Sequence, residues 1–303
     1  MKIKYGILSA ALMLLSVELF SQPTNDSIPR LSLSKVAQVN QSDSYISLPG
    51  DIGNLEPLIF EANINPNFVI RKREDSRIMA VLTPQVMIRM YDEHSFPVRT
   101  PSYIPQLSIY YLNGSPLSSR HTTFFARLAH HSNGQDGSFY AESEDGEPRI
   151  NLKTGDFSTN FIELGLIRTS YGYRKNAVKF FKSSFEIHPR YWMNSTLRGR
   201  YSGFRWHNSF IVYKLPLSFG AENRKSNFSV KAETFWMLDS INDWDTFDFK
   251  RFNGMLTLYY HPNFLEDIGF FVRFYHGADY YNIYFDRRID FIQFGLMTEI
   301  LRF

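Results

Sequence analysis

The feature that most restricts the fold of this chain is a repeated alternation of apolar and polar residues. It occurs in segments of about ten residues that are separated by turn-rich stretches. In the clearest segment, residues 78–91, Ile78 and Leu82 share one face while Arg89 lies on the other. A helix of 3.6 residues per turn would not sort them in this way. The sequence therefore predicts strands with one apolar and one polar face.

Twelve such segments are expected, and together they predict an all-β fold, a transmembrane antiparallel β-barrel of about 12 strands. The apolar faces would meet lipid and the polar faces would line the lumen. An even strand number places both ends of the chain in the periplasm. Phe294, Leu296 and Ile300 share one face of the last segment while Phe303 falls on the other, so a β-bulge is predicted before the C-terminus. The segments cover residues 44–48, 57–70, 77–91, 104–113, 121–133, 158–170, 178–193, 203–217, 226–238, 251–261, 267–278 and 289–303.

Composition agrees with a barrel. The 28 Phe and 18 Tyr among 303 residues suit aromatic girdles at the two membrane interfaces. The mean hydropathy of −0.27 does not argue against a membrane protein, because alternating strands average out in a sliding window. The absence of cysteine excludes disulfides, thiolate metal sites and a lipid-modified N-terminal cysteine.

Three regions follow one another along the chain. Residues 1–21 carry Lys2 and Lys4 ahead of a short apolar run and predict a signal peptide. A transmembrane anchor is the alternative, but the run is short for a spanning helix and Glu18 interrupts its end. Residues 22–45 are polar and predict a mobile periplasmic lead-in, and residues 46–303 predict the barrel. Without residues 1–21 the chain has 31 basic and 29 acidic residues, and neither this charge nor any motif indicates nucleic-acid binding.

Polar residues interrupt the apolar face of two neighbouring segments. Side chains repeat every two residues in a strand, so His130 and Ser132 share the lipid-facing side of segment 121–133, and His131 points inward. In the next segment Asn160 has the lipid-facing phase, whereas Glu163 faces the lumen. Polar groups on a lipid face are costly unless they satisfy one another or lie near the interface. Their presence therefore requires an explanation.

Two explanations are open from these residues alone. In a catalytic triad, Ser132 would attack an ester carbonyl, His130 would take its proton, and Asn160 would accept a hydrogen bond that fixes the imidazole tautomer. Alternatively, the three residues are interfacial polar groups at strand ends, where side chains meet lipid headgroups.

Two dense blocks resemble the outer membrane phospholipase A family. Residues 130–134, HHSNG, match its His-x-Ser-Asn-Gly signature, and residues 158–160, STN, match the Ser-x-Asn that supplies its third catalytic residue. The segment SFPVRTPSYIPQL at 95–107 is similar to a Ser-x-Pro-x-Arg stretch that leads into Tyr-x-Pro-Gln-Leu. Weaker similarity occurs at 188–192, HPRYW, and in the last strands.

The resemblance implies an outer-membrane phospholipase A1/A2 that acts on glycerophospholipids and lysophospholipids as a calcium-dependent homodimer. It places Ca²⁺ on the Gln135 carbonyl, on residue 156 and on Ser95 of the partner subunit, with Gly134 at the oxyanion. The family has serine where this chain has Asp156, and a carboxylate also suits calcium. The connection 134–157 is longer than usual in the family, so its other acidic residues are alternative ligands: Asp136, Glu142, Glu144, Asp145 and Glu147.

Two other functions compete with this one. A lipid A deacylase also carries a His-x-Ser pair on its lipid face, but its third member is a glutamate and Glu163 has the wrong phase for that role. A non-catalytic porin-like barrel would share the polar lumen, which every barrel has, so lumen polarity cannot separate the two.

Overall fold

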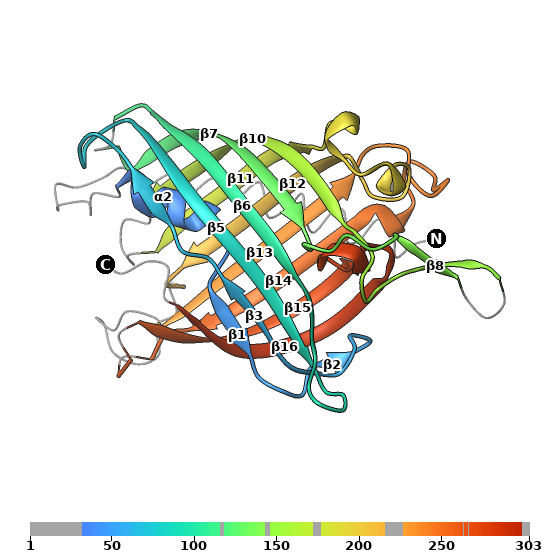
Figure 1. Cartoon of the computed structure of the whole chain (residues 1–303). Helices are drawn as coiled ribbons and strands as arrows, with labels where there is room; N and C mark the ends of the chain where they lie inside the picture. The colour runs from blue at the N-terminus through green and yellow to red at the C-terminus, as the bar shows by residue number, and fades with distance from the viewer. Residues whose placement is uncertain are drawn as a thin grey trace, which may run out of the picture.

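The computed structural model describes residues 32–115, 118–142, 146–171, 177–215, 227–262, 264–265 and 267–298. Twelve antiparallel strands follow one another around a sheet that the β1–β16 pairing closes (Figure 1). Their bounds are β1 (Tyr45–Ser47), β3 (Leu58–Ile64), β5 (Ile78–Tyr91), β6 (Val98–Asn113), β7 (Arg120–Ser132), β10 (Ser158–Tyr171), β11 (Val178–Ile187), β12 (Phe204–Tyr213), β13 (Phe228–Met237), β14 (Phe252–Tyr260), β15 (Ile268–Ala278) and β16 (Arg288–Thr298).

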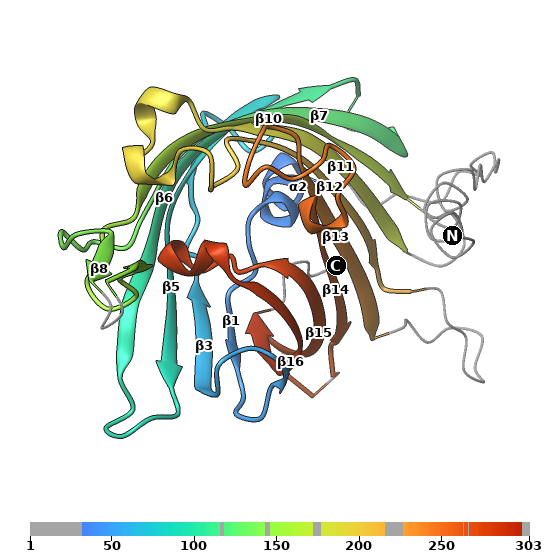
Figure 2. The ribbon, with the colours of Figure 1, turned by 90° about the vertical axis from the view of Figure 1, so that its right-hand side faces the viewer.

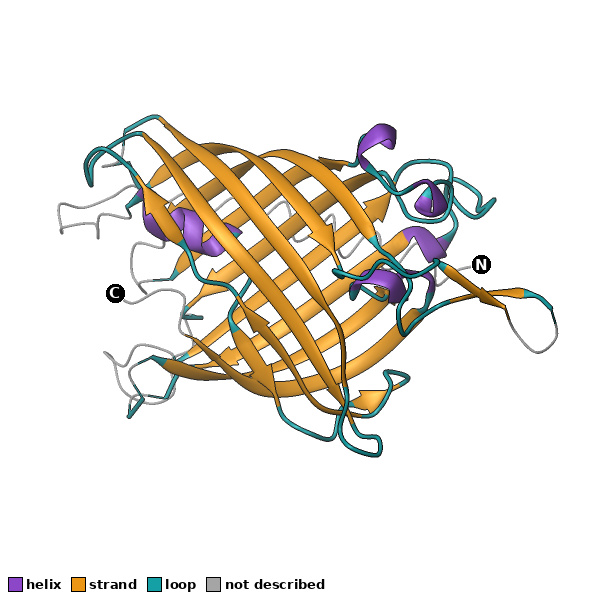
Figure 3. Cartoon of the chain, in the orientation of Figure 1, coloured by secondary structure: helices purple, strands orange, loops and turns teal. Residues whose placement is uncertain are grey.

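Shorter elements decorate the barrel (Figure 3). The helix α2 (Leu33–Asn40) precedes β1, and we call the end of the barrel where it lies the α2 end. The opposite end, the loop end, carries the longer connections. These contain the hairpin of β8 (Tyr140–Glu142) and β9 (Pro148–Ile150) and the 3₁₀ turns η1 (Arg190–Trp192), η2 (Ser195–Leu197), η3 (Phe249–Arg251) and η4 (Asn282–Asp286). Strand β2 (Ile52–Gly53) pairs with β16, and β4 (Phe68–Ile70) pairs with β5.

The predicted barrel of twelve strands is confirmed, and most strand ends agree within a few residues. β6 starts at Val98 rather than 104, because its residues Pro101 and Pro105 are accommodated within the strand. The segment predicted over 178–193 stops at Ile187, where Pro189 precedes η1. The predicted signal peptide, the residues 22–31 of the lead-in and the bulge before Phe303 lie outside the described residues.

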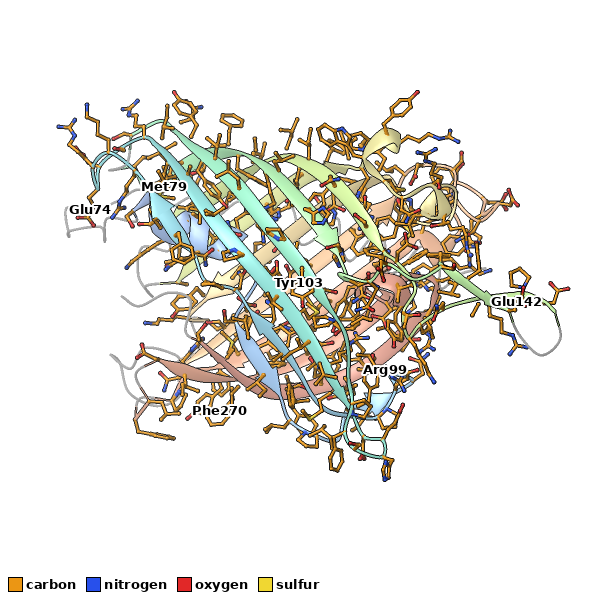
Figure 4. All side chains as sticks on the ribbon, in the orientation of Figure 1. Glu74, Met79, Arg99, Tyr103, Glu142 and Phe270 are labelled. Atoms are coloured by element: carbon orange, nitrogen blue, oxygen red, sulfur yellow. The ribbon has the colours of Figure 1, made fainter. Side chains whose placement is uncertain are left out.

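The two faces of each strand differ as the alternation predicts. In β5, Ile78 is 61% exposed and Leu82 44%, whereas Arg89 is buried in the lumen. Exposed aromatic residues gather on the outer surface towards both ends of the barrel. At the α2 end they include Tyr111, Phe124, Phe228, Tyr260 and Phe270, the last of which Figure 4 labels; towards the loop end they include Tyr103, Phe185, Phe204 and Trp206.

The segment before β1 differs from the expected mobile lead-in. α2 lies inside the ring of strands (Figure 2). Its residues Leu33, Val36 and Ala37 are buried in an apolar cluster with inward-facing strand residues. At its C-terminal end, the Asn40 carbonyl accepts a hydrogen bond of 2.9 Å from the Arg127 guanidinium. Apolar positions at i, i+3 and i+4 form this buried face.

The lumen is polar only in part, which corrects the expectation of a polar interior. The α2 end is filled by α2 and apolar strand residues, and the loop end by an apolar cluster of loop residues. Between these clusters, lumen-facing charged residues of neighbouring strands form ion pairs, and a cavity of about 380 Å³ remains. The cluster at the α2 end includes Met79, Val81, Tyr110, Phe125, Ile167, Phe180 and Ile211; that at the loop end includes Phe139, Phe157, Leu197, Tyr201, Ile283 and Phe285.

Among the described residues, no helix is long and apolar enough to cross a membrane.

Candidate active site

The candidate site lies on the outer surface where β7 ends and β10 begins. These strands pair antiparallel, and their register sets Asn160 directly opposite His130 and Ser158 opposite Ser132. Side chains of directly opposed residues point to the same face of a sheet. His130, Ser132 and Asn160 are therefore on the lipid-facing side, and each is half-buried.

Hydrogen bonds fix the orientation of the Asn160 amide and, through it, the tautomer of His130. The Asn160 Nδ2 group donates to the Trp192 carbonyl at 3.0 Å, since a carbonyl oxygen can only accept. The Asn160 Oδ1 atom therefore faces His130 Nδ1, 2.9 Å away, and must accept a hydrogen bond from the Nδ1–H group. In the neutral imidazole this leaves Nε2 as the basic nitrogen.

Ser132 does not complete the chain of hydrogen bonds in this structure. Within the described part of the molecule, no hydrogen bond joins its hydroxyl to His130. The two residues stand at i and i+2 on one face, roughly 6.6 Å apart along the strand. Catalytic hydrogen bonds are often long in the absence of substrate and tighten when it binds.

The turn after Ser132 is built around the buried Asn133, which is 1% exposed. Its Nδ2 group donates to the Gly155 carbonyl at 2.8 Å, and its Oδ1 accepts from the Phe157 N–H at 3.0 Å. Gly134 then takes a φ of +68°, which favours glycine, and a Cβ there would meet the Tyr103 ring at 3.2 Å. Among the described residues the Gly134 N–H has no acceptor. It is thus a donor near Ser132 that remains available.

The predicted calcium ligands Gln135 and Asp156 lie on segments that run side by side. The Gly137 N–H donates to the Thr154 carbonyl, and the Asp156 N–H donates back to the Gly137 carbonyl, each at 3.0 Å. The rings of Phe139 and Phe157 anchor both segments in the apolar cluster of the loop end. A main-chain carbonyl and a carboxylate are oxygen donors of the kind that calcium prefers, so the donor set fits the ion.

The other predicted ligands are placed less closely. Ser95 lies on the β5–β6 turn with a φ of +68°, and among the described residues no hydrogen bond joins it to Gln135 or Asp156. The Asp156 carboxylate accepts a hydrogen bond from Asn194. Glu142, labelled in Figure 4, is exposed at the end of β8 on the projecting β8–β9 hairpin, while Glu144 and Asp145 lie outside the described residues. No cluster of three or more His, Cys, Asp or Glu that could hold a metal is found in the described part of the chain.

The lumen side of the same two strands carries a paired charge network. Arg127 donates to Glu163 at 2.8 Å, and Lys182 approaches the same carboxylate at 2.7 Å. Closer to the site, the Thr159 hydroxyl lies 2.9 Å from His188 Nδ1, and His188 Nε2 lies 2.8 Å from Glu186. Because a carboxylate can only accept, His188 Nε2 donates to Glu186, and in the neutral ring, which burial favours, Nδ1 accepts from the Thr159 hydroxyl.

Sequence reasoning missed two contributors to the site. Asn133 belongs to the matched signature, but it holds the turn through hydrogen bonds to residues 155–157. The sequence does not show that this segment lies next to Asn133. Trp192 acts through its main-chain carbonyl, which leaves no trace in residue identity. The weak similarity at 188–192 was the available sign that this loop belongs to the site.

A closed antiparallel barrel with an apolar exterior is the fold by which a chain satisfies its backbone hydrogen bonds in lipid with strands. The molecule is accordingly a multi-pass β-barrel of the bacterial outer membrane.

Solved structures with a similar fold include outer membrane phospholipases. The Escherichia coli outer membrane phospholipase A superposes with a TM-score of 0.54 and 12% identity over 88% of this chain and 97% of that chain. An active-site mutant of that enzyme, with asparagine replaced by alanine, superposes with a TM-score of 0.54 and 11% identity over 92% of this chain and 96% of that chain. The Salmonella typhi outer membrane phospholipase, a dimer with bound calcium, superposes with a TM-score of 0.52 and 13% identity over 80% of each chain.

No family model and no curated protein matches the sequence. At 11–13% identity the structural likeness shows the fold alone.

Proposed function

We propose that this protein is an outer-membrane phospholipase A that hydrolyses the acyl esters of glycerophospholipids and lysophospholipids. The observation that carries the proposal is the Asn160–His130 hydrogen bond on the lipid-facing side, in a tautomer that leaves His130 Nε2 basic. Ser132 is on the same face, two residues further along the strand. The triad lies at the end of two strands. In a bilayer this is the depth of the lipid ester groups, which lie between the acyl chains and the headgroups.

The residues suit acyl transfer in two stages. The Ser132 hydroxyl oxygen attacks the ester carbonyl while its proton moves to His130 Nε2, and the free Gly134 N–H stabilises the oxyanion. When the tetrahedral intermediate collapses, the ester bond breaks and the departing lipid alkoxide takes the proton from His130. Water, deprotonated by the same nitrogen, then attacks the acyl-serine ester; the bond to the Ser132 oxygen breaks, that oxygen takes the proton back from His130, and the fatty acid is released. Asn160 holds the imidazole in position throughout.

Calcium and a second copy of the chain belong to the same proposal. The Gln135 carbonyl and the Asp156 carboxylate would hold the ion, with Ser95 of the partner subunit as a further ligand. When bound, its positive charge would stabilise the oxyanion of the tetrahedral intermediate. A homodimer would also cover a lipid-facing site that one barrel leaves open.

The porin-like alternative is disfavoured by what fills the lumen. α2 and its apolar partners occupy one end, and loop residues from several connections pack over the other. The lipid A deacylase is disfavoured because Glu163 faces the lumen, where it pairs with Arg127.

The test is release of fatty acid from phospholipid micelles by the refolded protein in detergent, with calcium or with a chelator. Ser132→Ala should abolish release while the barrel stays heat-stable. Ser158→Ala, which changes the hydroxyl opposite Ser132 on the same face, is the matched control and should retain activity. Equal hydrolysis by the Ser132 variant and the wild type would exclude Ser132 as the nucleophile.

A further inference from the structure

The β11–β12 loop, residues 188–203, is fixed against the candidate site by several main-chain contacts. The Trp192 carbonyl accepts from Asn160, the Asn194 N–H donates to the Ser158 carbonyl at 3.0 Å, and Met193 forms a bridge with Thr159. Within the loop, the Trp192 N–H donates to the Pro189 carbonyl at 2.7 Å and closes η1. The η1 residues are therefore held next to the first residues of β10, 158–160.

This loop is basic and contains no acidic residue. Of its three arginines, Arg200 is engaged by Asp286 at 2.9 Å and by the Tyr140 hydroxyl at 2.8 Å. Arg190 and Arg198 are exposed, and neither has an ion pair or side-chain hydrogen bond within the described residues. Arg190 is the one beside the site, because its Cα lies within about 8 Å of the Trp192 Cα, two residues on.

The neighbours of Arg190 suit the surface of a membrane. Tyr191 is 93% exposed and Trp192 46%. Tyr and Trp side chains concentrate at the level of lipid headgroups, because one end of each ring system is apolar and the other is polar. An exposed guanidinium that precedes these two rings in the chain would meet the phosphate layer of the bilayer.

We propose that Arg190 binds the phosphate of the lipid whose ester is cleaved, and so selects phospholipids over neutral esters. This inference rests on the proposed function. The planar guanidinium offers paired N–H donors that match phosphate oxygens, and no carboxylate in the loop competes for them. In a glycerophospholipid the phosphate and the scissile esters are attached to one glycerol. Arg190 precedes Trp192 by two residues, and the Trp192 carbonyl orients Asn160, which positions His130. A phosphate held by Arg190 therefore places the ester of the same lipid beside the triad.

The test compares a lysophospholipid with a monoacylglycerol of the same acyl chain, each in phosphate-free detergent micelles. Arg190→Gln should lower kcat/KM for the lysophospholipid about tenfold, as expected for a lost hydrogen bond to a charged group, and leave that for the monoacylglycerol unchanged. Arg190→Lys should retain part of the preference. Arg198→Gln, an equally exposed arginine beyond η2, is the control and should behave as the wild type.

Three results would overturn the inference: no change in Arg190→Gln, an equal loss for both esters, or a loss for monoacylglycerol that appears only when a non-hydrolysable phospholipid shares the micelle. The last would assign Arg190 to neighbouring lipids. If the wild type hydrolyses neither ester, the proposed function fails separately. Lysophospholipid affinity of the Ser132→Ala barrel, with and without Arg190→Gln, then still tests Arg190, and equal affinities would refute its role.

Discussion

Replacing Asn160 with alanine is the most direct test of how the site is organised. The side chain makes two hydrogen bonds, to His130 Nδ1 at 2.9 Å and to the Trp192 carbonyl at 3.0 Å. Because asparagine is neutral, it orients the imidazole but does not pair electrostatically with the imidazolium that forms during catalysis. Its removal should therefore cost about one neutral hydrogen bond, some 0.5–1.5 kcal/mol of transition-state stabilisation.

This free energy corresponds to a roughly two- to tenfold decrease in kcat/KM. Loss of the nucleophile in Ser132→Ala should cost at least about 10³-fold. The assay is the initial rate of fatty-acid release from lysophospholipid micelles at saturating calcium. The heat-dependent shift in gel mobility that folded barrels show checks that each variant is folded. An Asn160 variant as inactive as the serine variant would refute the view that its contribution is geometric.

Asn160→Asp sharpens the same test. An aspartate would turn a carboxylate oxygen towards the Trp192 carbonyl, where asparagine donates a hydrogen bond, so one acceptor would face another. We expect it to be no more active than Asn160→Ala at neutral pH, although a carboxylate is the usual third member of a serine triad. Activity above the wild type would show that the Trp192 contact does not constrain the site.

Three further predictions concern the nucleophile, the ion and the helix α2 inside the barrel. A sulfonyl fluoride should label Ser132 and no other strand serine, as peptide mass spectrometry would show, because only an activated hydroxyl reacts readily; labelling elsewhere would point to another site. Asp156→Ala should shift the calcium dependence of both hydrolysis and dimer cross-linking to higher concentrations, and full activity of a demonstrated monomer in excess chelator would contradict this coupling. Val36→Asp should lower the unfolding temperature of the barrel and expose α2 to protease, whereas Gln38→Asp on the exposed face of the helix should do neither.

The two-residue period of the strands made most of the fold predictable. Alternation in segments such as 78–91 gave twelve strands, and it gave the outward phase of His130, Ser132 and Asn160 through their spacing alone. The ends of strands were less predictable where proline was present, as in β6, because proline ends some strands and is tolerated within others.

Features that depend on long-range packing were not predictable. α2 has only eight residues, so its apolar positions are too few to stand out from the polar segment around it. Inward-facing Met79 and Ile167 break the rule of a polar lumen, and they do so because α2 covers them. The anchoring of segment 134–157 by Phe139 likewise requires knowing which loops meet at the loop end. The roles of Ser95, Gln135 and Asp156 as calcium ligands stay predictions.

The lumenal charges explain how a strand pair can carry a polar site on its lipid face. Arg127 and Glu163 are directly opposed in the β7–β10 register, and so are His130 and Asn160, three residues further along. A slip of one residue would turn His130 or Asn160 to the other face and would also separate the buried Arg127–Glu163 pair. Breaking a buried ion pair is strongly destabilising, because it leaves an uncompensated charge. The pair on the inner face thus penalises every register except the one that places Asn160 beside His130. Since the Asn40 carbonyl of α2 accepts a hydrogen bond from Arg127, the seating of α2 and the candidate site depend on the same register.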